Sequence, residues 1–152
     1  MKLAHQIKLK VFSYGRHNED DKLILGKLLE FFPFDLEEEK IELKKTGALG
    51  MDENQITIYE VVLTKEKHIS RFLENLKEKI DGNQKKLILE QLESRLDDNL
   101  DFFLRFDKDE CLKNNKLQLT DSGNCFHLKM SIAAFPKKRN IALGIVNNLF
   151  KI

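Results

Sequence analysis

The sequence predicts an α+β fold, with a single domain, a mixed or antiparallel sheet of about five strands, and helices packed on one face. Apolar and polar residues alternate with a period of two in several short segments, as in half-buried strands. Other segments repeat apolar residues at helical spacing. A chain of 152 residues with 41% hydrophobic residues is long enough for one compact core.

The first half of the chain predicts three strands and one helix. We expect Asn18 to cap the helix and Pro33 to end it, with Gly26 in its middle packed closely against the sheet. The last two strands are expected to pair as a hairpin through a segment that contains two glycines. The strands are expected over residues 5–12, 40–45 and 55–63.

The second half predicts two helices, followed by two strands with a short helix between them. Thr64 is expected to cap the first helix, and Asn83 to start the second. Asp107 with Glu110 three residues later forms a capping-box pattern that opens the short helix. The longer helices are expected over residues 64–80 and 83–96, and the strands over 100–106 and 125–133.

Pro136 separates this pattern from the end of the chain. We therefore expect an α+β domain over residues 1–135 and, over residues 136–152, a basic linker followed by a C-terminal amphipathic helix. The apolar face of this helix must pack on the domain or on a partner. It carries Ile141, Ile145, Val146, Leu149 and Phe150.

The net charge of +1 conceals an uneven distribution. Residues 1–18 contain four lysines and arginines and no acid, and residues 122–152 contain five and no acid, so the middle of the chain is acidic. If the terminal strands lie together, they form a basic surface. The alternative is that two unrelated ends are basic by chance.

Several classes of protein do not fit the sequence. No apolar run approaches the ~18 residues that a membrane span needs, and no signal peptide precedes the first strand, so a cytoplasmic protein with reduced Cys111 and Cys125 is expected. The four histidines have no metal-ligand spacing, and no serine lies in a nucleophile elbow. We expect no metal, no cofactor and no catalysis. The enzymatic alternatives are that Cys111 and His127 meet in space, or that Asp97 and Asp98 act as acid and base, although a turn is favoured for that pair.

Leu104-Arg105-Phe106-Asp107-Lys108 matches the Arg-Phe-Asp-Lys strand-end motif of a family of small archaeal proteins described as RNA-binding and as predicted exosome subunits. His17-Asn18-Glu19-Asp20-Asp21-Lys22 is similar to the acidic helix start of that family, and Gly47 to the opening of its hairpin. The resemblance covers residues from about 5 to 133. It implies an RNA-binding domain whose fold resembles a ribosomal protein that binds 5S ribosomal RNA.

The hairpin departs from the family pattern. The family usually has Gly-His-aromatic-Gly-Asn-Pro-Ile there, whereas the histidine, aromatic residue and proline are absent from Gly47–Ile56. Whether this hairpin retains a binding role therefore stays open. Asp109 also stands where the family tends to have glutamine, and the tail from Pro136 lies outside the resemblance.

The main hypothesis is a non-catalytic RNA-binding protein that recognises RNA shape and phosphates through a basic sheet face. Helices on one side of a sheet leave the other side open to RNA, and Phe12, Tyr14 or Phe103 is placed to stack on unpaired bases. Phe103 and Phe12 have an alternative role, as a second small core under the C-terminal helix. The candidate RNA-binding residues are Lys8, Lys10, Arg16, Lys44, Arg105, Lys108, Lys129, Lys137, Lys138 and Arg139.

Two further alternatives concern these cations and the tail. Arg105 and Lys108 have acidic neighbours at Asp101, Asp107 and Asp109, and exposed pairs of this kind contribute little energy. The second hypothesis for function is a protein-interaction subunit of a larger assembly, or a homodimer formed through the C-terminal helix, with little RNA affinity of its own.

Overall fold

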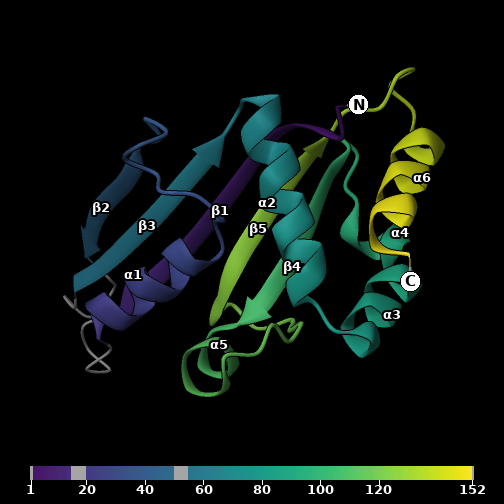
Figure 1. Cartoon of the computed structure of the whole chain (residues 1–152). Helices are drawn as coiled ribbons and strands as arrows, with labels where there is room; N and C mark the ends of the chain where they lie inside the picture. The colour runs from purple at the N-terminus through teal and green to yellow at the C-terminus, as the bar shows by residue number, and fades with distance from the viewer. Residues whose placement is uncertain (1, 15–19, 50–54, 152) are drawn as a thin grey trace.

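Five strands form one antiparallel sheet in the computed structural model, which describes residues 2–14, 20–49 and 55–151 (Figure 1). The strands are β1 (Ala4–Tyr14), β2 (Leu43–Leu49), β3 (Gln55–Leu63), β4 (Asp101–Asp107) and β5 (Cys125–Ile132). Their order across the sheet is β2-β3-β1-β5-β4, so the strands from the two ends of the chain, β1 and β5, are direct neighbours. The predicted α+β class with a sheet of five strands is confirmed, and every pairing is antiparallel.

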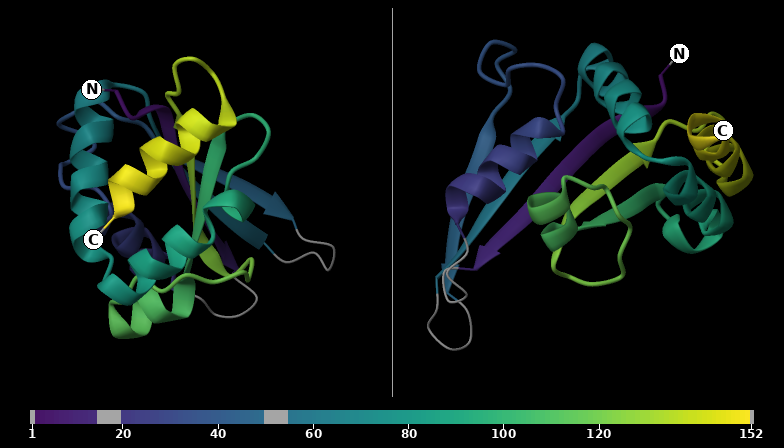
Figure 2. Two further views of the ribbon diagram at one scale, coloured as in Figure 1. Left: turned by 90° about the vertical axis from the view of Figure 1, so that its right-hand side faces the viewer. Right: turned by 60° about the horizontal axis from the view of Figure 1, so that its bottom comes forward.

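The helices form two groups around this sheet. In the described part of the chain they are α1 (Asp21–Glu30), α2 (Glu66–Lys79), α3 (Gly82–Glu90), α4 (Leu92–Arg95), α5 (Lys108–Asn114) and α6 (Arg139–Phe150). Helices α1, α2 and α5 lie on one face of the sheet (Figure 1). Helices α3, α4 and α6 gather beside β4, where α6 packs against α3 and α4 (Figure 2).

The inward phase of each strand supplies the core. On β1, Ile7, Leu9 and Val11 are at most 1% exposed, and Phe102, Leu104 and Phe106 on β4 are fully buried. Each such side chain contributes about 1.5–3 kcal/mol when it leaves water. Since successive strand residues point to opposite faces, the polar residues between these positions must lie on the face away from α1, α2 and α5.

Aspartates begin three of the helices. Asp107 Oδ1 accepts a hydrogen bond from the backbone N–H of Glu110 at 2.9 Å, so the cap predicted for the short helix α5 is confirmed. Asp81 caps α3, and Asp20 caps α1 by accepting from the N–H groups of Lys22 and Leu23. The cap predicted for α1 at Asn18 lies outside the described residues.

Other predicted boundaries differ from the structure. Strand β2 begins at Leu43 instead of residue 40, because the preceding segment turns with Lys40 at a φ of 58° and Ile41 N–H bonded to Leu36 O. The N-cap of α2 is Lys65, with no side-chain hydrogen bond, and the helix predicted over 83–96 is divided at Gln91. The close packing predicted for Gly26 is wrong, because nothing lies within 4 Å of the position its Cβ would take.

The C-terminal helix packs on the same chain. Ala142, Val146 and Phe150 on α6 are fully buried and belong to the main hydrophobic core. The apolar face predicted for the tail is therefore covered by α3 and α4. None of the described helices has the length and apolar character needed to cross a bilayer.

Candidate nucleic-acid interface

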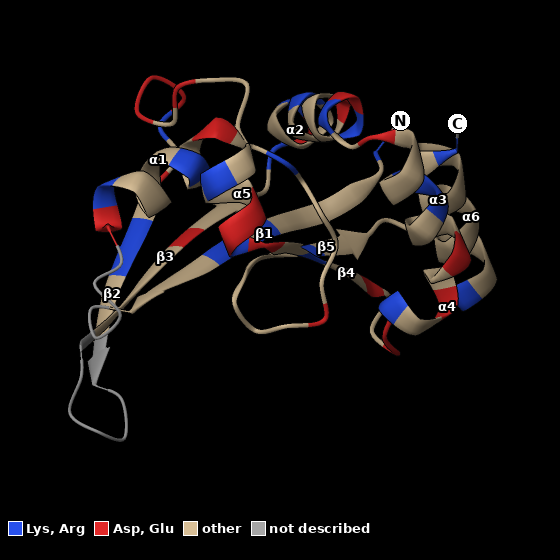
Figure 3. Ribbon diagram, turned by 90° about the horizontal axis from the view of Figure 1, so that it is seen from below, with Lys and Arg blue, Asp and Glu red and all other residues tan. Residues whose placement is uncertain are grey.

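The sheet face opposite α1, α2 and α5, here called the outer face, is not covered by any of the described helices over β2, β3 and β1 (Figure 3). Strand register arranges its polar side chains in rows, because residues directly opposite one another in neighbouring antiparallel strands point to the same side. One row crosses all five strands and contains Lys44, Glu60, Lys10, His127 and Arg105. The next row contains Val62, Lys8, Lys129 and Phe103.

Positive charge is concentrated on β1, β5 and β4 in these rows. Lys8 and Lys129 are direct cross-strand partners, an arrangement of like charges that costs stability. Lys129 Nζ lies 3.5 Å from a carboxylate oxygen of Asp101, and Glu60 is opposite Lys10. The two rows thus contain five cations and one carboxylate, that of Glu60, with Asp101 beside Lys129, which leaves a positive surface suited to phosphates.

His127 lies at the centre of this charge. Its imidazole pKa is lowered below the ordinary value, first by burial and then by the positive charges of Arg105, Lys10, Lys129 and Lys8. Four cations from three strands therefore act on one side chain. In the free protein this favours the neutral form of His127 at neutral pH.

Aromatic rings lie among these cations. Lys10 Nζ is 5.4 Å from the ring centroid of Phe12, which lies 6.3 Å from that of Tyr14. Phe103 and His127 form a second pair with centroids 5.5 Å apart. Phe12 and Phe103 are half-buried on the outer face and do not form a second core under the C-terminal helix, because α6 packs against α3 and α4 instead.

Two hollows flank the pair formed by Arg105 and His127. One, of about 230 Å³, is lined by Lys10, Phe12, Gly123 and Cys125. The other, of about 540 Å³, lies between the outer face and α4. Both include Arg105 and His127, so these side chains form the ridge between two recesses of the outer face.

Lys108 lies in the interior, although it was predicted to contact RNA. It is 1% exposed, its Nζ donates to the backbone oxygen of Phe12 at 2.8 Å, and it lies 4.9 Å from the ring centroid of Tyr14. Its role in this structure is to join the start of α5 to the end of β1. It is therefore removed from the set of cations that phosphates can reach.

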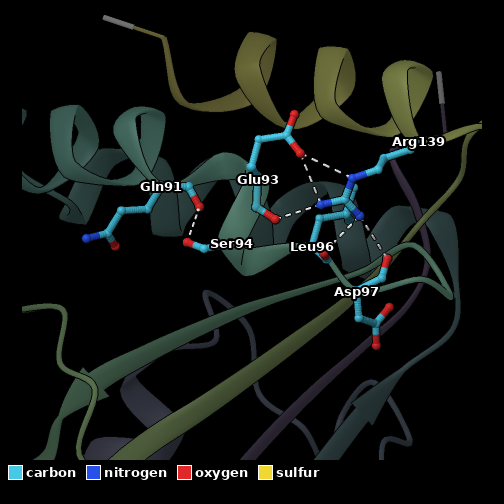
Figure 4. Close-up of polar contacts among 6 residues, drawn as sticks. All are labelled: Gln91, Glu93, Ser94, Leu96, Asp97 and Arg139. Atoms are coloured by element: carbon cyan, nitrogen blue, oxygen red, sulfur yellow. Dashed lines mark hydrogen bonds and ion pairs between the residues drawn. The ribbon is translucent and has the colours of Figure 1, made fainter.

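The remaining candidates lie apart from the rows. Lys137 and Lys138 are exposed between β5 and α6, whereas Arg139 is held by Glu93 and by backbone oxygens of residues 93, 96 and 97 (Figure 4). These contacts occupy its guanidinium at the junction of α6 and α4. Arg16 lies outside the described residues.

The cysteines offer no activated nucleophile. Burial raises the pKa of Cys111 to about 12 and also raises the pKa of Cys125, and both are free thiols. Cys111 does not lie beside His127, whose recess contains Cys125 instead. Among residues 2–14, 20–49 and 55–151, no group of three histidines, cysteines or acids is placed to hold a metal.

Arg95 is a functional candidate that the sequence did not indicate. It lies at the end of α4, where its Nε and Nη2 donate to Gln91 Oε1 at 2.9 and 2.6 Å and its Nη1 approaches Phe103 O at 3.5 Å. Burial is the largest cause that lowers its pKa, and Arg105 acts in the same direction. A spacing of ten residues to Arg105 gives no sign that the two arginines line one hollow.

Comparison with known proteins adds an independent result. A family model described as RNA binding matches residues 6–132. The RNA-binding protein PAB1135 of Pyrococcus abyssi is 24% identical over 143 residues, or 94% of this chain and 91% of that protein. The crystal structure of a DUF54 protein from Archaeoglobus fulgidus is 26% identical and has a TM-score of 0.81, covering 96% of this chain and 99% of that one.

A second solved structure, the DUF54 protein Mth689 of Methanothermobacter thermautotrophicus, is 26% identical with a TM-score of 0.76. The match covers 98% of this chain and 99% of the Mth689 chain. The region that the family model matches contains β2, β3, β4 and β5, all of β1 except its first two residues, and every cation of the two rows on the outer face.

Proposed function

The chain belongs to the RNA-binding family whose model it matches, and from this premise we propose that it binds RNA without catalysis, through the phosphates and shape that the outer face can contact. The observation that carries the proposal is the strand register, which brings Lys8, Lys10 and Lys129 together with Arg105 on the outer face. Described helices leave this face uncovered over β2, β3 and β1, and α4 borders it at β4. Lysine stems lie along the sheet while their ammonium groups reach water, where phosphates can contact them.

Charge reversal tests this proposal. Arg105→Glu combined with Lys129→Glu should abolish most RNA binding at low salt. The control, Lys67→Glu combined with Lys77→Glu on α2, makes the same change in net charge on the helix side of the sheet and should retain more RNA binding. Electrophoretic mobility shift with a structured RNA measures both, and thermal unfolding without RNA confirms that each variant is folded. Equal loss in the two double variants would show that only net charge matters and would refute a defined interface.

We extend the proposal to an accessory role in RNA processing or degradation in the cytoplasm, as the resemblance to predicted exosome subunits implies. This role requires a protein partner as well as RNA. Co-purification of the protein with exosome subunits, resistant to ribonuclease treatment, is the expected result. Isolation of RNA alone with the protein would contradict it.

The alternative function, a protein-interaction subunit, is favoured by one observation. Phe135, at the bend before α6, is 94% exposed and is followed by the exposed Pro136, Lys137 and Lys138. On this alternative, Phe135→Ser should abolish association with a partner or a second copy, as measured by light scattering and co-purification, and leave RNA affinity unchanged. Loss of RNA affinity with unchanged association would instead assign this bend to the RNA interface.

A further inference from the structure

The hollow beside α4 is a recess of the outer face that is partly lined by aromatic side chains. It measures about 540 Å³, within the range of about 300–1,000 Å³ that small ligands occupy in proteins, and is here called the α4 hollow. Three separate segments form it. They are the α4 region with Ser94 and Arg95, the outer side of β4 and β5 with Phe103, Arg105 and His127, and the segment at Asp121.

Its aromatic side has the properties of a stacking platform. The rings of Phe103 and His127 lie with centroids 5.5 Å apart and planes 42° apart, and both side chains are half-buried. They come from directly neighbouring strands, so the sheet fixes their positions. Rings of this kind stack on nucleobases of any sequence, because every base has a π-face.

Two arginines line the hollow from different walls. Arg95 is fixed by Gln91 Oε1 and by the approach to Phe103 O, and Arg105 Nη1 donates to Asp121 O at 3.2 Å. A guanidinium held in this way loses little freedom when it stacks on a base or binds a phosphate. The row that contains Phe103 also places Lys129 and Lys8 immediately beside the platform.

We propose that the α4 hollow takes one unpaired nucleotide of the bound RNA, with the base stacked against Phe103 and His127 and the adjacent phosphates on Arg105, Lys129 and Lys8. The proposal rests on the proposed function and narrows its ligand to RNA with a bulge, loop or single strand. A base inside an A-form duplex is stacked between its neighbours and cannot present its face to these rings.

The probe is a short RNA duplex with one bulged 2-aminopurine nucleotide, compared with the fully paired duplex of the same flanking sequence. Stacking of one base predicts that the bulged RNA binds about 5- to 150-fold more tightly than the paired RNA. The fluorescence of 2-aminopurine, which depends on stacking, should change on binding. Equal affinities with unchanged fluorescence would overturn the inference.

Variants assign the effect to the platform. Phe103→Leu and His127→Leu should each remove most of the preference for the bulge and the fluorescence change, whereas Phe103→Tyr keeps an aromatic ring and should retain both. Phe34→Leu, on a ring that packs with Phe32 and His68 away from the hollow, is the matched control and should behave as wild type. A preference that persists in both leucine variants would place the unpaired base elsewhere.

The two proposals fail in different ways. If the wild-type protein binds paired and bulged RNA equally and with a steep salt dependence, the outer face binds RNA but the α4 hollow does not select an unpaired base. If it binds neither RNA at low salt, the proposed function itself is refuted. Thermal unfolding of each variant without RNA separates loss of binding from loss of fold.

Discussion

Neutralising Lys8 should weaken RNA binding and at the same time slightly stabilise the free protein. Lys8 is directly opposite Lys129 on β5 and opposite the uncharged Val62 on β3, so Lys8→Gln removes a repulsion and breaks no observed ion pair. Relief of one like-charge pair that is partly exposed is worth about 0.5 kcal/mol, or ~1–2 °C in Tm for a chain of this length. A substitution that raises Tm and weakens RNA binding would show that Lys8 serves the binding of the ligand and not the stability of the fold.

The loss of binding can be estimated independently. One ammonium group about 4 Å from a phosphate in a watery environment is worth about 1 kcal/mol, or ~5-fold in Kd. The slope of log Ka against log salt should become shallower by about 0.7 for single-stranded RNA and by up to about 0.9 if the duplex behaves as DNA does. Fluorescence anisotropy over a potassium chloride series measures both quantities, and calorimetric unfolding measures the stability.

Lys67→Gln on α2 is the matched control, because it removes the same charge from an exposed position on the helix side. It should leave the salt slope as in wild type. The reasoning is refuted if Lys8→Gln leaves the slope unchanged, or if its weaker binding comes with a lower Tm, since the effect would then come from the fold.

Three other predictions test the fold and the site. Gly26→Ala in α1 should raise the free energy of unfolding by about 0.5–1 kcal/mol in chemical denaturation, because the added methyl meets no atom within 4 Å. Lys108→Met should lower Tm by ~4–8 °C, since loss of a charge-assisted hydrogen bond of about 2 kcal/mol leaves the oxygen of Phe12 without that donor. Burial first, and then the neighbouring cations, lower the pKa of His127 in the free protein. Bound phosphates offset these cations and raise that pKa, so binding takes up a proton and RNA affinity should rise as pH falls below neutral. Isothermal titration in buffers of different ionisation enthalpy measures that proton, and His127→Gln should abolish its uptake.

Much of the fold follows from local patterns in the sequence. The alternation of Leu104 and Phe106 with Arg105 indicated both a strand and the side on which the arginine lies. Asp107, placed where that alternation stops, indicated the helix start that the structure contains. These features depend on neighbours within a few residues, which is why the sequence alone was sufficient to predict them.

Features that depend on packing between distant segments were less accessible. Alternation ends at Asp107 and gives no information on Lys108, whose burial depends on β1, almost a hundred residues earlier in the chain. The predicted role of Gly26 failed because a helix pattern does not show what lies opposite one position. The row through Lys10, His127 and Arg105 likewise depends on strand order and register, which no local pattern specifies.

The two faces of one sheet divide stability and function between them. Leu9, Leu104 and Leu128 point inward and are fully buried, and their burial stabilises the strands. The same strands can therefore carry outward residues that lower the stability of the fold. The close approach of Lys8 to Lys129 is tolerable because the repulsion in water is small beside the burial of even one such leucine. A phosphate that lies between the two ammonium groups attracts both of them and screens their mutual repulsion. The sheet fixes the spacing of the two backbone positions before the ligand arrives, so binding has less to order than it would with two lysines on separate segments.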